Sequence, residues 1–320
     1  MSRDSGLSGP KVLVYQASHP EKFADVLKDL GITNVITAKS SDASPPDLSD
    51  VEVMFGWNIP VDWFARAPKL KWVQWSGAGV DSVAMRRDQI PEGVKLTRIL
   101  DQFSAPIAEY VFTYLLYITR DVRRQQKSQE QKRWDPFRAE LLSGKTIGVA
   151  GLGSIGAEIV RKARAFDMKV TGLSATGRNR HLVDVHYTAD EWNDFVAPLD
   201  VLVLTLPLTD RTRHVIHAPV LERMKREAII VNIGRGALIR ETDLIPRLAA
   251  GRIRAAVLDV FEREPLPTDS PLWTLHNAFV SPHMSGPSEV DKTCAFFAEN
   301  MRRFLQGDPL IGLVDFTRQY

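Results

Sequence analysis

The sequence has almost no cysteine and no long hydrophobic run. Cys294 is the only cysteine in 320 residues, which excludes an internal disulfide and suits a reducing compartment. The longest apolar run, "YVFTYLLYI" at 110–118, is far shorter than the roughly 20 residues of a membrane helix. The first ten residues, "MSRDSGLSGP", contain no apolar stretch typical of a secretory signal. We therefore expect a soluble, cytoplasmic protein.

An excess of one charge is also missing. The chain has 41 Lys and Arg against 39 Asp and Glu, and the basic residues are spread along it. Proteins that bind nucleic acid concentrate basic residues on one face, so we expect no such partner. The cluster "RDVRRQQKSQEQKR" (120–133) is typical of the solvated end of a long helix. His214 and His217 have no third ligand nearby in the sequence, so we interpret them as surface residues and expect no metal site.

What the sequence does contain is an alternation of short β-branched strands with amphipathic helices. A chain of 320 residues favours two domains of about 150 residues each. The alternation predicts two doubly wound α/β domains with parallel sheets, joined by two crossing helices. We expect the first domain at 1–104, the second at 105–286, and a return helix and tail at 287–320 that pack on the first. A single long helix is predicted from about Ala105 to Lys127.

A glycine-rich loop opens the second domain. "VAGLGSIG" places Gly151, Gly153 and Gly156 in the G-x-G-x-x-G spacing, directly after a predicted strand and before a predicted helix. Such glycines allow a tight turn, close approach of a pyrophosphate, and close packing of helix on strand. The helix N-terminus then offers free N–H groups to the phosphates. The second domain is therefore predicted to be a dinucleotide-binding Rossmann domain.

The acid that normally binds the ribose is missing. Ser174 stands at its place, about 20 residues after the glycines, in the stretch "GLSATGRNR" (172–180), which has two arginines and no carboxylate. Asp167 precedes the predicted strand and so lies at its wrong end. A 2′-phosphate would be repelled by a carboxylate, whereas Ser174, Thr176 and Arg178 can bind one. The sequence favours NADP over NAD. The alternative is that the arginines face solvent and the site accepts either dinucleotide.

Three polar residues follow later predicted strands. Arg235 lies between two glycines in "VNIGRGALI", Glu264 lies in "LDVFEREPLP", and His283 lies in "FVSPHMSG". Ligands of doubly wound sheets bind at the carboxyl ends of strands, so these side chains are expected to converge near the nicotinamide. Each residue alone is more often structural. Together, downstream of a glycine loop, they predict a catalytic site.

The chain resembles the D-isomer-specific 2-hydroxyacid dehydrogenase family. The matching stretches are "GKTIGVAGLGSIG", "LPLTDRTRHVI", "VNIGRGALIRETDLIPRLAAGRIRAAVLDVFEREPLP" and "SPLWTLHNAFVSPHMSG", which cover 144–286 almost continuously, and "WVQWSGAGVD" at 72–81. The resemblance implies a flavodoxin-like substrate domain before the Rossmann domain. It also implies that Arg235 binds the carboxylate of a 2-oxo acid, His283 donates a proton, and Glu264 orients His283 and stabilises its imidazolium.

The resemblance also implies a set of binding residues. Those expected to bind the cofactor are Gly151, Leu152, Gly153, Ser154, Ile155, Gly156, Ser174, Thr176, Arg178, Leu206, Pro207, Ile233 and Asp259, the last through the nicotinamide carboxamide. Those expected to bind the substrate are Gly77, Ala78, Gly79, Trp57 and Trp134. In some relatives the residue at the position of Trp134 reaches a partner subunit's pocket, although packing in the core or at an interface is an equal alternative here. The helix at 110–118 is expected to form a homodimer interface.

The resemblance leaves more than one function open. The missing ribose acid is similar to NADP-dependent glyoxylate and hydroxypyruvate reductases, which predicts NADPH-dependent reduction of a small 2-oxo acid to a D-2-hydroxy acid. A dinucleotide-sensing binding protein, similar to the corepressors with this fold, is an alternative. A dehydrogenase of a larger or phosphorylated 2-hydroxy acid is another. The chain ends shortly after the predicted return helix, so we expect no additional regulatory domain of the kind found in long phosphoglycerate dehydrogenases.

Overall fold

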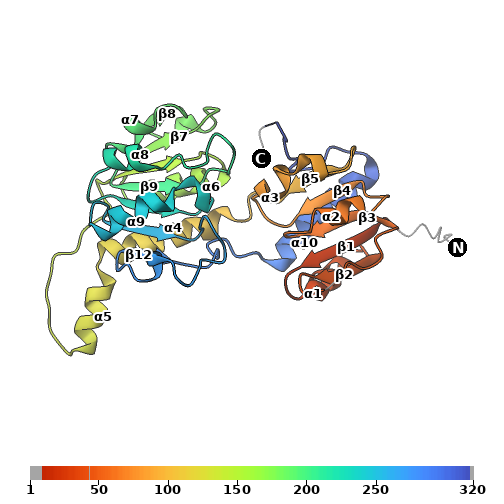
Figure 1. Cartoon of the computed structure of the whole chain (residues 1–320), viewed down its shortest axis with the longest axis horizontal. Coiled ribbons are helices and arrows are strands. Elements are labelled where there is room, and N and C mark those ends of the chain that lie inside the picture. Colours follow the sequence, from red (N-terminus) through yellow and green to blue (C-terminus); the bar gives the residue numbers. More distant parts are fainter. Residues whose placement is uncertain (1–8, 43, 318–320) are drawn as a thin grey trace. The chain divides into compact units, whose positions relative to one another are not determined.

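The computed structural model describes residues 9–42 and 44–317, and these form two compact units (Figure 1). Unit 1 contains the described residues up to Gln102 and from Ser288 onward, and unit 2 contains Phe103–Pro287. The chain therefore passes between the units twice, close to the expected boundaries at 104 and 286. Within the described residues, no helix is both long and apolar enough to cross a membrane.

Unit 1 is a five-stranded parallel sheet covered by helices. Its strands lie in the order β2-β1-β3-β4-β5, which is the flavodoxin-like arrangement. The strands are β1 (Lys11–Gln16), β2 (Val35–Lys39), β3 (Val51–Gly56), β4 (Trp72–Trp75) and β5 (Lys95–Arg98). The helices are α1 (Pro20–Asp29), α2 (Asp62–Ala65), α3 (Asp81–Ala84), the short 3₁₀ turn η1 (Arg87–Gln89) and α10 (Val290–Gln306).

Unit 2 is a seven-stranded parallel sheet. Its order, β12-β11-β10-β9-β6-β7-β8, places the first strand of the unit in the middle, as in Rossmann domains. The strands are β6 (Thr146–Ala150), β7 (Lys169–Leu173), β8 (Val185–Tyr187), β9 (Val201–Leu204), β10 (Ile229–Asn232), β11 (Ala255–Leu258) and β12 (Ala278–Val280). The helices are α4 (Ser104–Thr119), α5 (Val122–Glu130), α6 (Ser154–Ala165), α7 (Trp192–Val196), α8 (Ala218–Arg223) and α9 (Glu241–Ala249), with 3₁₀ turns η2 (Arg180–Leu182), η3 (Gly236–Leu238) and η4 (Pro271–Trp273). The predicted pair of doubly wound α/β domains is confirmed.

The single helix predicted for 105–127 was wrong. The structure has two helices, α4 and α5, separated at Asp121, whose φ of 46° is left-handed and ends the first helix. The Asp121 carboxylate then accepts a hydrogen bond from the N–H of Arg124 at 3.3 Å and caps α5. Helical periodicity is the same on both sides of such a break, so the pattern did not reveal it. Strand β8 was also missed, because its three residues include a histidine and are too short to alternate visibly.

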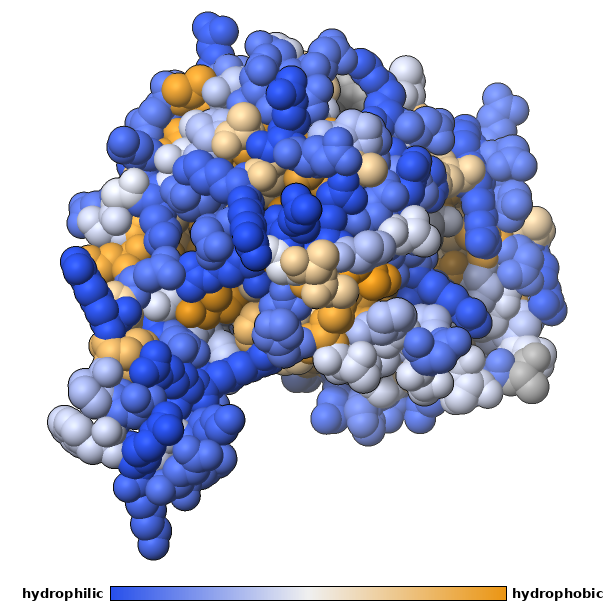
Figure 2. All heavy atoms as spheres, turned by 60° about the vertical axis from the view of Figure 1, so that its left-hand side comes forward, coloured by the Kyte–Doolittle hydropathy of each residue, from blue (hydrophilic) through white to orange (hydrophobic). Residues whose placement is uncertain are grey.

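Helix α5 and the chain that follows it project from the rest of unit 2 (Figure 1). Figure 2 shows that this projecting segment carries mainly hydrophilic side chains, in agreement with its sequence "VRRQQKSQE". Trp134 lies just beyond α5 and is 94% exposed. The alternative that Trp134 packs in the core of its own chain is therefore wrong.

The return helix α10 packs on the unit 1 sheet. Phe297 stacks on Phe55 of β3 and Trp72 of β4, with ring centroids 4.4 and 5.1 Å apart. The three rings are fully buried, and such stacked pairs add to the free energy gained by burying their apolar surface. Residues from both ends of the chain therefore build one core.

A buried polar network fixes the register of α10. The Nδ2 group of Asn300 donates to Oε1 of Gln74 and to the carbonyl of Ile311, both at 2.9 Å, while its Oδ1 accepts from the N–H of Ile311 at 2.8 Å. Gln74 Oε1 also accepts from Thr97 Oγ1 at 2.8 Å, and Thr97 accepts from Trp72 Nε1 at 2.8 Å. Because these groups are buried, each depends on the others for its hydrogen bonds.

We expect Asn300→Ala to lower the free energy of unfolding by about 2 kcal/mol, because it removes one hydrogen bond to the buried Gln74 side chain and two to the backbone of Ile311. Urea unfolding followed by tryptophan fluorescence measures this change. Leu305→Ala on the exposed side of the same helix is the control, with an expected change below about 0.5 kcal/mol. Equal stabilities of the two variants would contradict the role of the network.

Candidate active site

The glycine loop joins β6 to α6 and fits the pyrophosphate of a dinucleotide. Gly151 has a φ of 103°, and Gly153 is the N-cap of α6 with open space where its side chain would be. A Cβ on Gly156 would lie 1.9 Å from the carbonyl oxygen of Gly151, so only glycine lets the helix start this close to the strand. No side chain caps α6, and the N–H groups of Ser154 and Ile155 therefore face outward for an anion.

The ribose loop after β7 (174–180) contains no carboxylate. Thr176 and Arg178 are exposed, and Thr176 Oγ1 accepts a hydrogen bond from the Arg178 N–H at 3.4 Å. Asn179 Nδ2 donates to the carbonyl of Leu152 at 2.9 Å, which ties the ribose loop to the glycine loop. Asp167 lies in the turn that precedes β7, at the opposite end of the strand, as the sequence predicted.

Ser174 is nearly buried, with 7% of its surface exposed, and its hydroxyl has a partner that the sequence did not reveal. Its Oγ lies 2.8 Å from Nε2 of His186, which is on β8. His186 is 12 residues further along the chain, in the strand that periodicity missed. The only sequence signal was a histidine in a short apolar stretch, which by itself is most often structural.

The segment after β9 lies beside the glycine loop and near the Arg235 loop. Thr205 Oγ1 donates to the carbonyl of Gly151 at 2.7 Å, and a Cβ on Gly234 would lie 2.9 Å from the carbonyl oxygen of Leu206. Strands β6 and β9 are neighbours at the point where the strand order reverses, which is where doubly wound sheets bind ligands. Leu206, Pro207 and Ile233 therefore lie along the predicted cofactor side of the sheet.

The loop that carries Arg235 follows β10. Asn232 is buried, donates from Nδ2 to the carbonyl of Arg235 at 2.9 Å, and accepts from the N–H of Gly234 at 3.2 Å. A Cβ on Gly236 would lie 1.8 Å from the carbonyl carbon of Phe261, so the Arg235 loop packs directly on the backbone that leads to Glu264. The half-buried Arg235 guanidinium also donates from Nη1 to the carbonyl of Gly234 at 2.7 Å.

His283 and Glu264 form a hydrogen-bonded pair. His283 Nδ1 lies 2.9 Å from Oε2 of Glu264, and Glu264 Oε1 accepts the N–H of Phe261 at 3.0 Å. Burial by itself raises the pKa of Glu264, but hydrogen bonds from His283 and Phe261, with the charges of His283 and Arg235, lower the pKa overall. Glu264 is therefore held as a carboxylate against one ring nitrogen of His283. The other nitrogen, Nε2, remains for chemistry.

Asp259 holds the His283 loop in place. Its carboxylate is fully buried and accepts hydrogen bonds from Ser281 Oγ at 2.5 Å and from the N–H groups of Met284 and Ser285 at 2.9 and 2.8 Å. Its carbonyl accepts the N–H of His283 at 2.9 Å. These contacts make Asp259 a positioning residue for the loop. Direct contact between Asp259 and the nicotinamide carboxamide stays a prediction.

His214, which the sequence predicted to be a surface residue, is partly exposed and has a carboxylate partner. Its Nε2 lies 2.8 Å from Oε1 of Glu262, whose N–H donates to Glu241 Oε1 at 2.7 Å. Burial raises the pKa of Glu241, and the hydrogen bond from Glu262 opposes this rise. The cluster ties the turn before Glu264 to the start of α9. Across residues 9–42 and 44–317, no group of three or more His, Cys, Asp or Glu could hold a metal ion.

In unit 1, the predicted substrate loop follows β4. The Trp57 ring lies directly against Gly77, where a Cβ would come within 2.0 Å of it. Ile99 N–H donates to the Gly77 carbonyl at 3.1 Å, and Arg98 Nη1 donates to the Ala78 carbonyl at 3.2 Å. The carbonyls of Gly77 and Ala78 are thus hydrogen-bonded to Ile99 and Arg98. The N–H groups of Ala78 and Gly79 donate to no acceptor in the described part of the chain.

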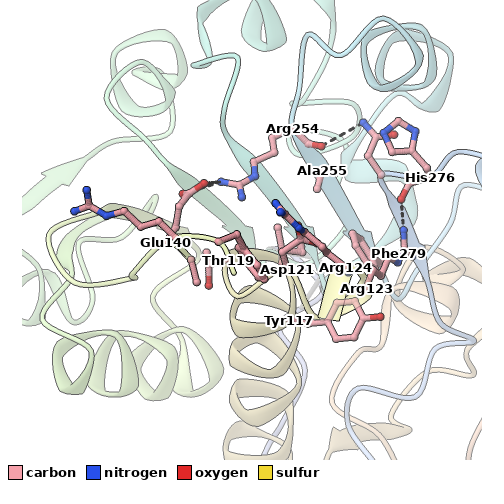
Figure 3. Close-up of a pocket in the computed structure, with 15 residues that line it drawn as sticks. Tyr117, Thr119, Asp121, Arg123, Arg124, Glu140, Arg254, Ala255, His276 and Phe279 are labelled. Carbon is pink, nitrogen blue, oxygen red and sulfur yellow. Dashed lines mark hydrogen bonds and ion pairs between the residues drawn. The ribbon is translucent and has the colours of Figure 1, made fainter. Parts of the chain in front are cut away.

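A pocket of about 590 Å³ lies elsewhere in unit 2 (Figure 3). Its lining includes Arg254 and Ala255 at the start of β11, and His276 and Asn277 just before β12. The pocket therefore lies at the amino ends of these strands, whereas the catalytic loops follow the carboxyl ends. Arg254 is paired with Glu140 at 2.9 Å across it. This pocket is separate from the candidate active site.

Comparison with known proteins agrees with this geometry. A family model described as "D-isomer specific 2-hydroxyacid dehydrogenase, NAD binding domain" matches residues 112–285. The D-3-phosphoglycerate dehydrogenase of Methanocaldococcus jannaschii is 33% identical over 312 residues, which are 93% of this chain but only 58% of that protein.

Two solved structures are similar over nearly the whole chain. A D-isomer specific 2-hydroxyacid dehydrogenase from Xanthobacter autotrophicus, in complex with NADPH and MES, has a TM-score of 0.88 and 31% identity and covers 98% of this chain and 100% of its own. An NADPH-dependent glyoxylate/hydroxypyruvate reductase from Sinorhizobium meliloti, in complex with NADP and sulfate, has a TM-score of 0.86 and 29% identity, with 97% and 100% covered. The glycine loop, the catalytic loops and these similarities together show that the chain belongs to the D-isomer-specific 2-hydroxyacid dehydrogenase family of oxidoreductases.

Proposed function

We propose that the protein reduces a small 2-oxo acid to a D-2-hydroxy acid with NADPH. The observation that carries the proposal is the pairing of His283 with Glu264, beside the Arg235 loop, on the same sheet as the glycine loop. The similarity to a glyoxylate/hydroxypyruvate reductase points to a short 2-oxo acid. The residues of the glycine loop and the ribose loop would hold NADPH, which when bound would supply a hydride for the C2 carbon of the substrate.

The residues of the chain supply the proton and the charge. His283 Nε2 donates its proton to the carbonyl oxygen as hydride reaches C2, because Nδ1 is occupied by Glu264. The Glu264 carboxylate stabilises the imidazolium before transfer and keeps the ring oriented. Arg235 binds the substrate carboxylate and polarises the carbonyl. The N–H groups of Ala78 and Gly79 bind a remaining carboxylate oxygen, and Trp57 limits the size of the acid.

NADP is the proposed cofactor because the ribose loop presents Arg178 and Thr176 and no carboxylate. The loop would hold the 2′-phosphate through a guanidinium, a hydroxyl and backbone N–H groups. Two structures similar to this chain were solved with NADPH or NADP, which supports the same choice.

We also propose that the protein is a cytoplasmic homodimer. The exposed Trp134 lies on a projecting segment that a second copy of the chain would cover, and Trp134 would contribute to the partner subunit's substrate pocket. The apolar residues of α4 would extend the interface.

Burial raises the pKa of the Cys294 thiol to about 12, so this thiol stays protonated and unreactive.

We expect Arg178→Ala to lower kcat/KM with NADPH by about tenfold or more and to leave kcat/KM with NADH unchanged, because one charge-assisted hydrogen bond to a phosphate is lost. Steady-state assays with glyoxylate, hydroxypyruvate, pyruvate and phenylpyruvate measure the change. Arg161→Ala removes an equal charge from the exposed face of α6 and serves as the control. Equal rates with NADPH and NADH in the unmodified enzyme would remove NADP as the preferred cofactor. Tight dinucleotide binding without turnover would favour the regulatory alternative.

Glu264→Gln should move the pH dependence of reduction. Reduction requires protonated His283, so kcat/KM falls at high pH. Without the carboxylate, the imidazolium loses its stabilising charge, and this alkaline limb is expected to move down by about 1 pH unit or more. A pH–rate profile of both proteins measures the shift. If the limb stays in place while only the maximum rate drops, Glu264 does not act through the charge of His283.

A further inference from the structure

His186 is hydrogen-bonded to Ser174, the residue at the position where an acid normally binds the ribose. We infer that Ser174 and His186 act as one hydrogen-bonded pair that receives the 2′ substituent of the adenosine ribose, and that His186 determines the preference between a 2′-phosphate and a 2′-hydroxyl. This inference rests on the proposed dinucleotide-dependent function and names two residues that would set its cofactor specificity.

The two residues are held together by the sheet. Strands β7 and β8 pair in parallel, with Gly172 opposite His186 and Leu173 opposite Tyr187. Ser174 continues this ladder, since its N–H donates to the Tyr187 carbonyl at 3.1 Å. The 2.8 Å contact between Ser174 Oγ and His186 Nε2 is therefore built on paired backbone. Ser174 is nearly buried and His186 is half-buried, so water competes weakly for this bond.

The hydrogen bond between the His186 imidazole and the Ser174 hydroxyl can run in either direction. When Nε2 is unprotonated, it accepts the Ser174 proton, and the serine oxygen presents only lone pairs. Such an oxygen accepts a hydrogen bond from a ribose 2′-hydroxyl, as the usual carboxylate does. When Nε2 carries a proton, it donates to Ser174, and the serine proton becomes available to a phosphate oxygen.

A positive charge on His186 favours the phosphate further. Glu191, just before α7, interacts electrostatically with His186. Arg178 lies on the ribose loop, four residues after Ser174. Asp184 just before β8 is already paired with Arg164 of α6 at 2.7 Å and with the Val170 N–H at 2.8 Å. A 2′-phosphate therefore meets Arg178 and a protonated His186. By linkage, binding of NADP draws a proton onto His186, and binding of NAD does not.

The experiment is isothermal titration calorimetry of NADP⁺ and NAD⁺ with the full-length protein. It compares the unmodified chain with His186→Gln, at about pH 6.5 and about pH 8, in two buffers of different ionisation enthalpy. Glutamine keeps a hydrogen-bonding side chain but cannot take up a proton. His181→Gln makes the same change at an exposed position of the neighbouring η2 turn and is the matched control.

In the unmodified protein and the His181→Gln control, we expect the preference for NADP⁺ over NAD⁺ to weaken by about tenfold from the lower to the higher pH, since one unit of pKa linkage is tenfold in affinity. We also expect net proton uptake on binding NADP⁺. The part of both effects that comes from His186 should be absent in His186→Gln. The ionisation of the 2′-phosphate itself is common to all three proteins and cancels in the comparison.

Two other outcomes overturn the inference in distinguishable ways. If NADP⁺ still binds better than NAD⁺ but the preference and proton uptake are the same with and without His186, the pair has no role and the proposed function stands. If neither dinucleotide binds the unmodified protein, the proposed function fails, and the inference fails with it. Ser174→Ala provides a second variant. It should reduce the preference for NADP⁺ at both pH values, and an unchanged preference would also count against the pair.

Discussion

The loops of the candidate active site in unit 2 depend on one buried carboxylate. Asp259 directly follows β11, and three donors from the His283 loop hydrogen-bond its carboxylate. A buried carboxylate is tolerated only when it is well hydrogen-bonded, so the loop and the charge stabilise each other. The loop needs this support because His283 has a φ of 51°, a left-handed conformation that few side chains favour. His283, the proposed proton donor, thus lies on a loop whose backbone is held by Asp259.

The other catalytic loops are placed by packing at close range. Gly236 sits against the backbone of Phe261, and the reciprocal contacts of Glu241 and Glu262 hold the turn that leads to Glu264. Arg235 and Glu264 come from loops after different strands, and these loops are held together by backbone packing at Gly236 and by the hydrogen bonds of Glu241 and Glu262. This arrangement provides the preorganisation that a site for hydride and proton transfer requires.

The sequence predicted the parts of the site that local pattern determines. The glycine loop, the three loops after the later strands and the doubly wound fold all follow from spacing and hydrophobic periodicity. Three features did not follow from it. Asp121 breaks a helix without interrupting the apolar period, and β8 is too short to show alternation. The third is the hydrogen bond between Ser174 and His186. The sequence predicted a role for Ser174, but His186 contacts it only because β8 pairs with β7. Tertiary pairing, unlike local pattern, leaves little trace in one sequence.

The placement of α10 has a consequence for how the chain acquires its structure. Phe297 and Asn300 complete the core of a unit whose strands lie at residues 11–98, while residues 103–287 form a separate unit in between. During synthesis, all residues of unit 2 have been added to the chain before the last residues of unit 1 are made. Phe55 and Trp72 therefore lack their packing partner Phe297 until α10 has left the ribosome. Unit 1 emerges first and is finished last, so it is the part of a nascent chain that most needs protection from aggregation.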